Sequence, residues 1–233
     1  MSLATGLLVA FAMIFTAEKI GTVYTMGEAP LLQKDVSIVV VDAGHGGFDP
    51  GKVGINGAEE KDINLAIAQK VASYLKAGDV EVIMTRDDDA GLYDSESTNK
   101  KVQDMKRRIE IMEEAAPDLT VSIHQNSYPE EYVHGAQVFY HEDSGEGQKL
   151  AAFIQQQFVK SVDPGNKRQI KANDSYYLLK KTSVPIVIVE CGFLSNYEEA
   201  GKLVTEEYQD KVAWAVYMGI MNYLNTRDGK NEQ

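Results

Sequence analysis

Short apolar runs alternate along the chain with stretches in which hydrophobic residues recur every three or four positions. The apolar runs are rich in β-branched residues and predict buried strands at 36–41 (VSIVVV), 80–84 (VEVIM), 119–124 (LTVSIH), 136–140 and 185–190 (PIVIVE). The periodic stretches predict amphipathic helices at about 62–77, 100–115, 150–158 and 208–223. Because strands alternate with helices, and the strands are apolar runs rather than alternating apolar and polar residues, the pattern predicts an α/β sheet covered by helices on both faces.

The two ends of the chain depart from this pattern. Residues 3–17 (LATGLLVAFAMIFTA) are apolar and uncharged, but they fall short of the ~20 residues that span a bilayer. No basic residue precedes them, and no clear small-x-small cleavage site follows. We expect residues 1–34 to be an export signal or a membrane anchor with its linker, residues 35–226 to form one folded domain, and residues 227–233 to be a polar tail.

Composition narrows the classes of partner. The 233 residues carry a net charge of −12, which argues against a nucleic-acid partner because phosphate binding needs basic patches. The single cysteine, Cys191, excludes an internal disulfide and is compatible with either redox compartment. The polar, acidic stretch 87–99 (DDDAGLYDSESTN) is predicted to be a surface loop.

Three of the predicted strands end in residues that can do chemistry: His45 follows the first, His124 ends the third and Glu190 ends the last. Ligands bind at the carboxyl ends of strands in open α/β sheets. Two imidazoles and a carboxylate are typical of a catalytic zinc site, and a second carboxylate has to stay off the metal to take a proton from water. Spacing alone does not decide which acid has which role, and the candidates are Asp42, Glu59, Glu60 and Glu190.

Four motifs occur in the order DAGHGGFDPG, GAEEKDINL, SIHQN and PIVIVECGFLSN. They resemble the successive signatures of the zinc-dependent N-acetylmuramoyl-L-alanine amidases, in the same order and with similar spacing, over residues 36 to about 225. The compact domain, without an attached cell-wall repeat module, most resembles the sporulation and germination amidases of spore-forming bacteria.

The resemblance implies a secreted or membrane-anchored peptidoglycan hydrolase that works outside the cytoplasmic membrane. It would cleave the amide between the lactyl group of N-acetylmuramic acid and the L-alanine of the stem peptide, so glycan strands and stem peptides are the expected partners. The implied fold is a twisted, mostly parallel but mixed sheet of about six strands flanked by helices. The family's Zn²⁺ ligands fall on His45, Glu60 and His124, and its catalytic glutamate falls on Glu190, with Glu59 as the alternative to Glu60.

Three other functions remain open from the sequence. They are a zinc peptidase acting on the stem peptide, a non-catalytic cell-wall-binding module, and a cysteine hydrolase with Cys191 as nucleophile and His124 as base. A lone cysteine at the end of a buried strand is more typical of small hydrophobic filler, and His134 and His141 are expected at the surface or rim. The stretch 124–190 leaves no room for a long helix over the metal, so we expect an open cleft.

Overall fold

The computed structural model describes residues 36–231, so the expectation for residues 1–34 lies outside the described part of the chain. The strands are β1 (Ile38–Ala43), β2 (Glu81–Met84), β3 (Leu119–Asn126), β4 (Gln137–Tyr140), β5 (Lys171–Ala172) and β6 (Ile186–Phe193). The helices are α2 (Glu60–Ala77), α3 (Lys100–Ala115), α4 (Gly145–Gln157), the π-helical turn Phe158–Val162, α5 (Tyr177–Lys181), α6 (Tyr197–Leu203) and α7 (Glu206–Asn231). Within the described residues, no helix has the length and apolar character needed to cross a membrane.

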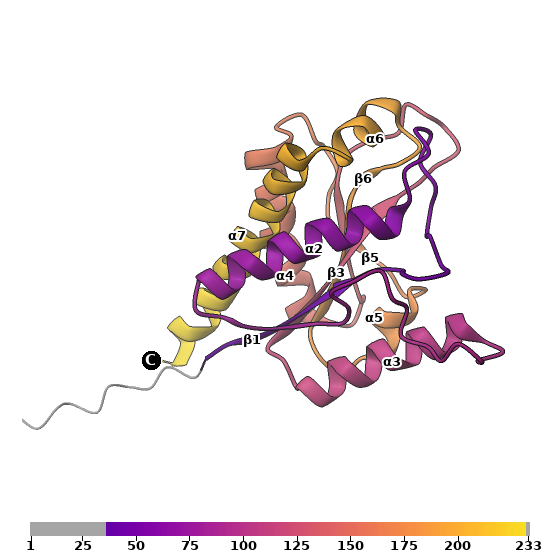
Figure 1. Ribbon diagram of the computed structural model, residues 1–233. Helices are drawn as coiled ribbons and strands as arrows, with labels where there is room; N and C mark the ends of the chain where they lie inside the picture. The colour runs from indigo at the N-terminus through magenta and orange to yellow at the C-terminus, as the bar shows by residue number, and fades with distance from the viewer. Residues whose placement is uncertain (1–35, 232–233) are drawn as a thin grey trace, which may run out of the picture. The chain divides into compact units, whose positions relative to one another are not determined.

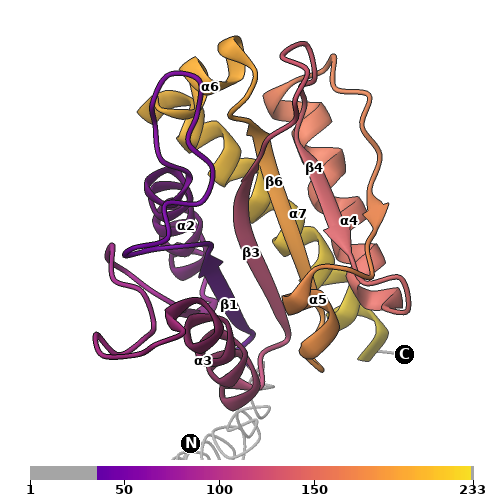
Figure 2. The same cartoon turned by 90° about the vertical axis from the view of Figure 1, so that its right-hand side faces the viewer.

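The strands of the described residues form a single mixed sheet in the order β2-β1-β3-β6-β4-β5. β2, β1, β3 and β6 run parallel to one another, β4 is antiparallel to β6, and β5 is parallel to β4. The central strands β1, β3 and β6 are almost entirely buried because parallel strands between two layers of helices are covered on both faces. The predicted α/β fold, a mostly parallel sheet of about six strands flanked by helices, is confirmed (Figures 1 and 2).

Each face of the sheet has its own hydrophobic core. Val39 and Val41 of β1 belong to the larger core, which is covered by α2, α4 and α7. Val40, between them, points to the opposite side and packs with Met112 of α3 and Leu178 of α5. Figure 2 shows α3 and α5 on the near face of the sheet and α4 and α7 on the far face. This alternation in each central strand is what the two-sided burial of a parallel sheet requires.

Several element boundaries differ from the predicted ones. The first strand starts at Ile38 instead of residue 36, and Val36 is 60% exposed. The last strand continues past Glu190 to Phe193, which pairs with Asn126 beyond an irregularity in the register. Helix α7 runs on to Asn231, whereas a polar tail was expected from residue 227. β5 and α5 were not predicted, because two and five residues are too few to establish a periodic pattern.

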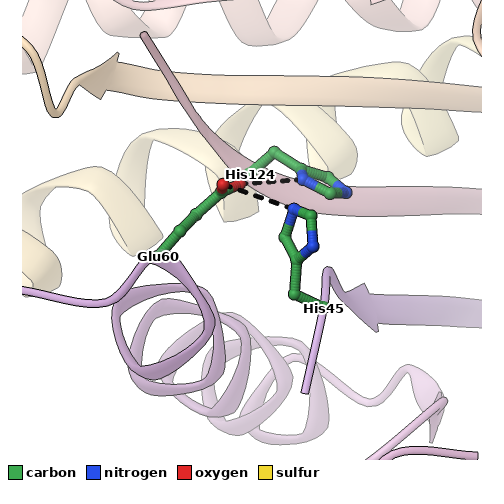
Figure 3. A group of neighbouring side chains, drawn as sticks. All are labelled: His45, Glu60 and His124. Atoms are coloured by element: carbon green, nitrogen blue, oxygen red, sulfur yellow. Dashed lines mark hydrogen bonds and ion pairs between the residues drawn. The ribbon is translucent and has the colours of Figure 1, made fainter. Parts of the chain in front are cut away.

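The sheet topology brings three chemically active residues to one edge. β1, β3 and β6 are neighbouring parallel strands, so their carboxyl ends meet at the same edge of the sheet. His124 of β3 pairs in register with Glu190 of β6, and His45 lies two residues beyond the end of β1. Glu60 begins α2 and reaches the same edge from the side (Figure 3).

Candidate active site

His45 stands in a tight turn that follows β1. Its φ of 63° lies in the left-handed region, which is uncommon for a residue other than glycine. Arg108, from α3, holds this turn by donating hydrogen bonds to the main-chain oxygens of Ala43 (2.8 Å) and His45. The carboxylate of Asp42 forms an ion pair with the buried guanidinium of Arg108. Burial opposes ionisation of Asp42, but Arg108 and two neighbouring hydroxyls lower its pKa to about 2. Asp42, one of the candidate carboxylates, therefore supports the turn.

A carboxylate fixes the orientation of the His45 ring. Oδ2 of Asp49 lies 3.1 Å from Nδ1 of His45, and Oδ1 accepts a hydrogen bond from the main-chain N–H of Gly51 (3.1 Å). Burial raises the pKa of Asp49, but the contacts with His45, with the main-chain N–H of Gly51 and with Lys101 together lower it, which keeps the carboxylate ionised. A hydrogen bond at Nδ1 determines which ring nitrogen carries the proton, so it leaves the lone pair of Nε2 facing Glu60, whose Oε2 is 3.3 Å away.

Glu60 is a charged residue in a buried position, with 2% of its surface exposed. Its oxygens accept main-chain hydrogen bonds from Gln125 (3.0 Å) and Lys52 (2.8 Å), and Nδ1 of His124 lies 3.0 Å from Oε1. Burial raises the pKa of Glu60, but the contacts with His124 and His45 lower it far below its ordinary value. The main-chain donors hold both oxygens in place, so this carboxylate is ionised and fixed in direction.

His45, Glu60 and His124 each offer one ligand atom, and these atoms all lie within 4.8 Å of one another (Figure 3). Two imidazoles and a carboxylate at this separation fit Zn²⁺, which binds nitrogen and oxygen at about 2.0–2.2 Å. The alternative carboxylate, Glu59, is 43% exposed and pairs with Lys61 at 3.4 Å. The geometry therefore favours Glu60 over Glu59 as the third member of the cluster.

Glu190 lies beside this cluster on β6 and is 7% exposed. Its Oε1 is 3.4 Å from the hydroxyl of Tyr176, and its buried Oε2 has no hydrogen-bond partner among the described residues. Burial is the main reason that the pKa of Glu190 is raised to about 7. A carboxyl group with a pKa near neutrality is suited both to accept a proton and to return it.

Tyr176 is a member of the site that the sequence did not reveal. It immediately precedes α5, and its ring packs edge to face on Phe139 of β4, with 5.5 Å between the ring centroids. This packing directs its hydroxyl toward Glu190. Tyr176 follows no predicted strand and belongs to none of the four motifs, so no pattern in the sequence marks it.

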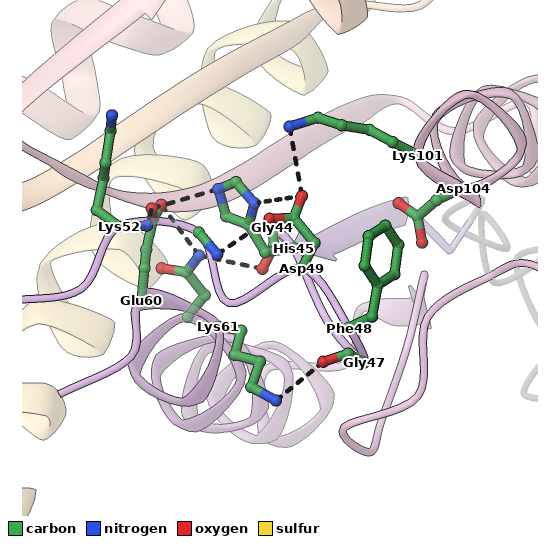
Figure 4. Close-up of polar contacts among 12 residues, drawn as sticks. Gly44, His45, Gly47, Phe48, Asp49, Lys52, Glu60, Lys61, Lys101 and Asp104 are labelled. Carbon is green, nitrogen blue, oxygen red and sulfur yellow. Dashed lines mark hydrogen bonds and ion pairs between the residues drawn. The ribbon is translucent and has the colours of Figure 1, made fainter. Parts of the chain in front are cut away.

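The cluster opens into a cavity of about 140 Å³ bordered by the turn after β1, by α3 and by the start of α5. Phe48 and Tyr93 meet edge to face on its wall, with centroids 5.2 Å apart (Figure 4 shows Phe48 beside this turn). The stretch 87–99, predicted as a surface loop, thus also forms part of the cavity through Tyr93. The side chains of His45 and His124 remain 21% and 19% exposed, so solvent reaches the cluster, and α4 packs away from it against α7.

The other reactive side chains lie outside this cluster. Cys191 is fully buried, its Sγ contacts the carbonyl of Val189, and burial raises the pKa of the thiol. A buried thiol of this kind does not supply the thiolate that a cysteine hydrolase needs. His134 is exposed and His141 is half-buried, as expected for surface or rim residues, and the metal-competent cluster contains neither of them.

Comparisons with known proteins agree on one family. A family model described as N-acetylmuramoyl-L-alanine amidase matches residues 39–222. The germination-specific N-acetylmuramoyl-L-alanine amidase of Bacillus subtilis (strain 168) is 35% identical over 193 residues, which cover 82% of this chain and 81% of the relative.

Solved structures give the same result. The CwlD amidase from Clostridioides difficile, in complex with the GerS lipoprotein, is 41% identical with a TM-score of 0.79, covering 82% of this chain and 99% of that chain. The N-acetylmuramoyl-L-alanine amidase from Clostridium difficile 630 is 32% identical with a TM-score of 0.72, and the match covers 82% of this chain and 97% of that chain.

Proposed function

The chain belongs to the N-acetylmuramoyl-L-alanine amidase family and is a peptidoglycan amidase, and we propose how its cleft performs the reaction. The bond cleaved is the amide between the lactyl group of N-acetylmuramic acid and the L-alanine of the stem peptide. His45, Glu60 and His124 hold a zinc ion, and Glu190 carries the proton. The observation that supports this proposal is the convergence of the three ligand atoms within 4.8 Å, next to a buried carboxyl group whose pKa is raised to about 7.

Zinc at this position would supply a Lewis acid that polarises the scissile carbonyl and makes water acidic near neutral pH. Glu190 accepts the proton of the attacking water and later delivers it to the nitrogen of the departing L-alanine. The hydroxyl of Tyr176 donates to Oε1 of Glu190 and thereby fixes the plane of the carboxylate, which leaves Oε2 to take the proton. Asp49 keeps the ring of His45 turned with Nε2 toward Glu60.

The place of action follows from the substrate. Peptidoglycan lies outside the cytoplasmic membrane, and we propose that the protein works there, with residues 1–34 as export signal or anchor. A role in the spore envelope is supported by the similarity to the germination-specific amidase of Bacillus subtilis.

Two glutamine variants test the assigned roles. Glu60→Gln replaces an anionic ligand with a weak neutral one, so zinc content and turnover should both fall. Glu190→Gln keeps the size of the side chain but cannot accept a proton, so this variant should keep near-stoichiometric zinc and lose about 100- to 10,000-fold in rate. Elemental analysis for zinc and initial rates, measured on both variants, decide which glutamate binds the metal and which transfers the proton. Loss of metal in the Glu190 variant, with metal and activity kept in the Glu60 variant, would show that the two roles are reversed.

Product analysis separates the remaining functions. Mass spectrometry of muropeptide digests should find a free lactyl carboxylate on N-acetylmuramic acid and a peptide that begins with L-alanine. Cleavage within the stem peptide, with L-alanine still attached to the sugar, would identify a zinc peptidase. Binding to cell walls with no new products from the zinc-loaded protein would identify a binding module.

A further inference from the structure

The charged side chains that line the cleft differ in whether a ligand can reach them. Among the described residues that line it, four carboxylates (Asp42, Asp49, Asp104 and Glu190) face two non-histidine cations, Lys101 and Arg108. The side chain of Arg108 is 2% exposed, and its donors are occupied by carboxylates and main-chain oxygens. The side chain of Lys101 is 69% exposed. Lys101 is therefore the cation, among these cleft residues, that a ligand can reach.

The present contact of Lys101 leaves most of its hydrogen-bonding capacity free. Its Nζ lies 3.5 Å from Oδ2 of Asp49, and the same oxygen lies closer to Nδ1 of His45, at 3.1 Å (Figure 4). An exposed ion pair of this length is weak. The ammonium group thus stands two contacts from a proposed zinc ligand, with donors available for another anion.

The position of Lys101 in its helix is unfavourable for stability. α3 starts at Lys100 and has no acidic residue in its first turn, so two adjacent lysines face the positive end of the helix dipole. Lys100 lies over the ring of Tyr93, 5.5 Å from the centroid, and thereby supports the cavity wall. Among the described residues, Lys101 lies over no aromatic ring, and its contact is the ion pair with Asp49. Its ammonium group adds to the positive potential at the cleft.

Substrate chemistry supplies an anion for this position. The chain carries a net charge of −12 and would repel an acidic stem peptide unless a local cation received it. When the nitrogen of L-alanine lies at the cluster of His45, Glu60 and His124, the next residue of the stem peptide lies within reach of the Lys101 side chain, whose Nζ contacts the carboxylate beside His45. We infer that Lys101 binds the carboxylate carried by that second stem residue and makes the enzyme prefer the acid over its amide. This inference rests on the proposed function, whose substrate it specifies further.

The test compares two soluble substrates that differ in one group. One is an N-acetylmuramoyl tripeptide with a free carboxylate on its second residue, and the other is the same compound with that carboxylate amidated. The wild-type enzyme should prefer the acid by roughly 5- to 10-fold in kcat/KM. Lys101→Gln should remove this preference through a higher KM for the acid, with kcat and zinc content unchanged, because Lys101 touches no reacting atom. Lys101→Arg should keep the preference, and Lys101→Glu should reverse it.

Lys106→Gln is the matched control, because Lys106 is exposed on the same helix but lines a different groove. It makes the same change in net charge and should leave the preference intact. Equal cleavage of both compounds by the wild type, an equal loss on both in Lys101→Gln, or the same effect from Lys106→Gln would overturn the inference while the amidase function stands. If the zinc-loaded wild type cleaved neither compound, the proposed function itself would fail.

Discussion

At the scale of single residues, the site combines groups that reach the reaction with groups that hold them in place. Asp49 belongs to the second kind. Its carboxylate bonds to Nδ1 of His45 and is itself held by the main-chain N–H of Gly51. Carboxylates that orient histidine ligands in this way typically account for a 10- to 100-fold difference in metal affinity.

We therefore predict graded losses of zinc affinity at this position. Asp49→Ala removes the partner of Nδ1 and should weaken zinc binding by roughly 10- to 100-fold, because the imidazole ring of His45 is then free to turn. Asp49→Asn keeps a neutral hydrogen-bond acceptor for Nδ1 and should therefore lose less zinc affinity than Asp49→Ala. Competition with a chelator measures the affinity directly, and rates at saturating zinc should recover most of the activity of both variants. Unchanged affinity in both would mean that Asp49 merely supports the turn.

The residues of the site differ in how far the sequence revealed them. His45, His124 and Glu190 each follow a β-branched run, so the expectation that they meet required only that strand ends share one edge of a sheet. Glu60 begins a helix, and its place among four candidate carboxylates followed from the family resemblance alone. Tyr176 reaches Glu190 through packing on a neighbouring strand, and a contact of this kind leaves no trace in local sequence.

At the scale of elements, long segments were predictable and short ones were not. The 18 residues of α2 repeat their hydrophobic positions over several turns, whereas α5 has five residues and β5 has two. β6 extended three residues beyond its predicted end at Glu190, because Cys191 to Phe193 continue the strand and pair across a bulge. Where a strand ends depends on the strand that it pairs with, and that strand lies far away in the sequence.

Helix packing gives a prediction at this scale. A Cβ added to Gly219 of α7 would lie 2.6 Å from the Cα of Ile154 in α4, so the two helices approach closely there. Alanine favours a helix over glycine by about 1 kcal/mol, but a clash with main-chain atoms forces α4 and α7 apart. Gly219→Ala should lower the free energy of unfolding by about 1–3 kcal/mol, as measured by urea denaturation of the metal-free protein.

Gly201 of α6 provides the matched control. A Cβ added there would meet nothing within 4 Å, so helix propensity acts alone. Gly201→Ala should raise the free energy of unfolding by about 0.5–1 kcal/mol. Equal shifts in both variants would contradict the close approach of the two helices.

At the scale of the whole molecule, the sheet and its two layers of helices position the site from segments distant in sequence. β1, β3 and β6 lie side by side although about 150 residues separate the first from the last. Arg108 adds a connection through the second layer, because it reaches from α3 to the turn that carries His45. The ligand geometry thus depends on the packing of both faces.

The last prediction concerns the part of the chain that this architecture needs. The main-chain N–H of Ile38 donates to the carboxylate of Asp118 (2.9 Å), while Val36 is 60% exposed, so the described fold starts at residues 37–38. The described residues from Val36 onward also form a compact unit by themselves. Deleting residues 1–34 should therefore leave the free energy of unfolding within about 0.5 kcal/mol of the full-length value, together with unchanged zinc affinity and kcat/KM on soluble muropeptides. Side-by-side denaturation, chelator competition and initial rates on the two proteins measure all three quantities. An unfolded truncated protein, or one with most of its activity on soluble substrate lost, would place part of residues 1–34 inside the catalytic domain and move its boundary toward the N-terminus.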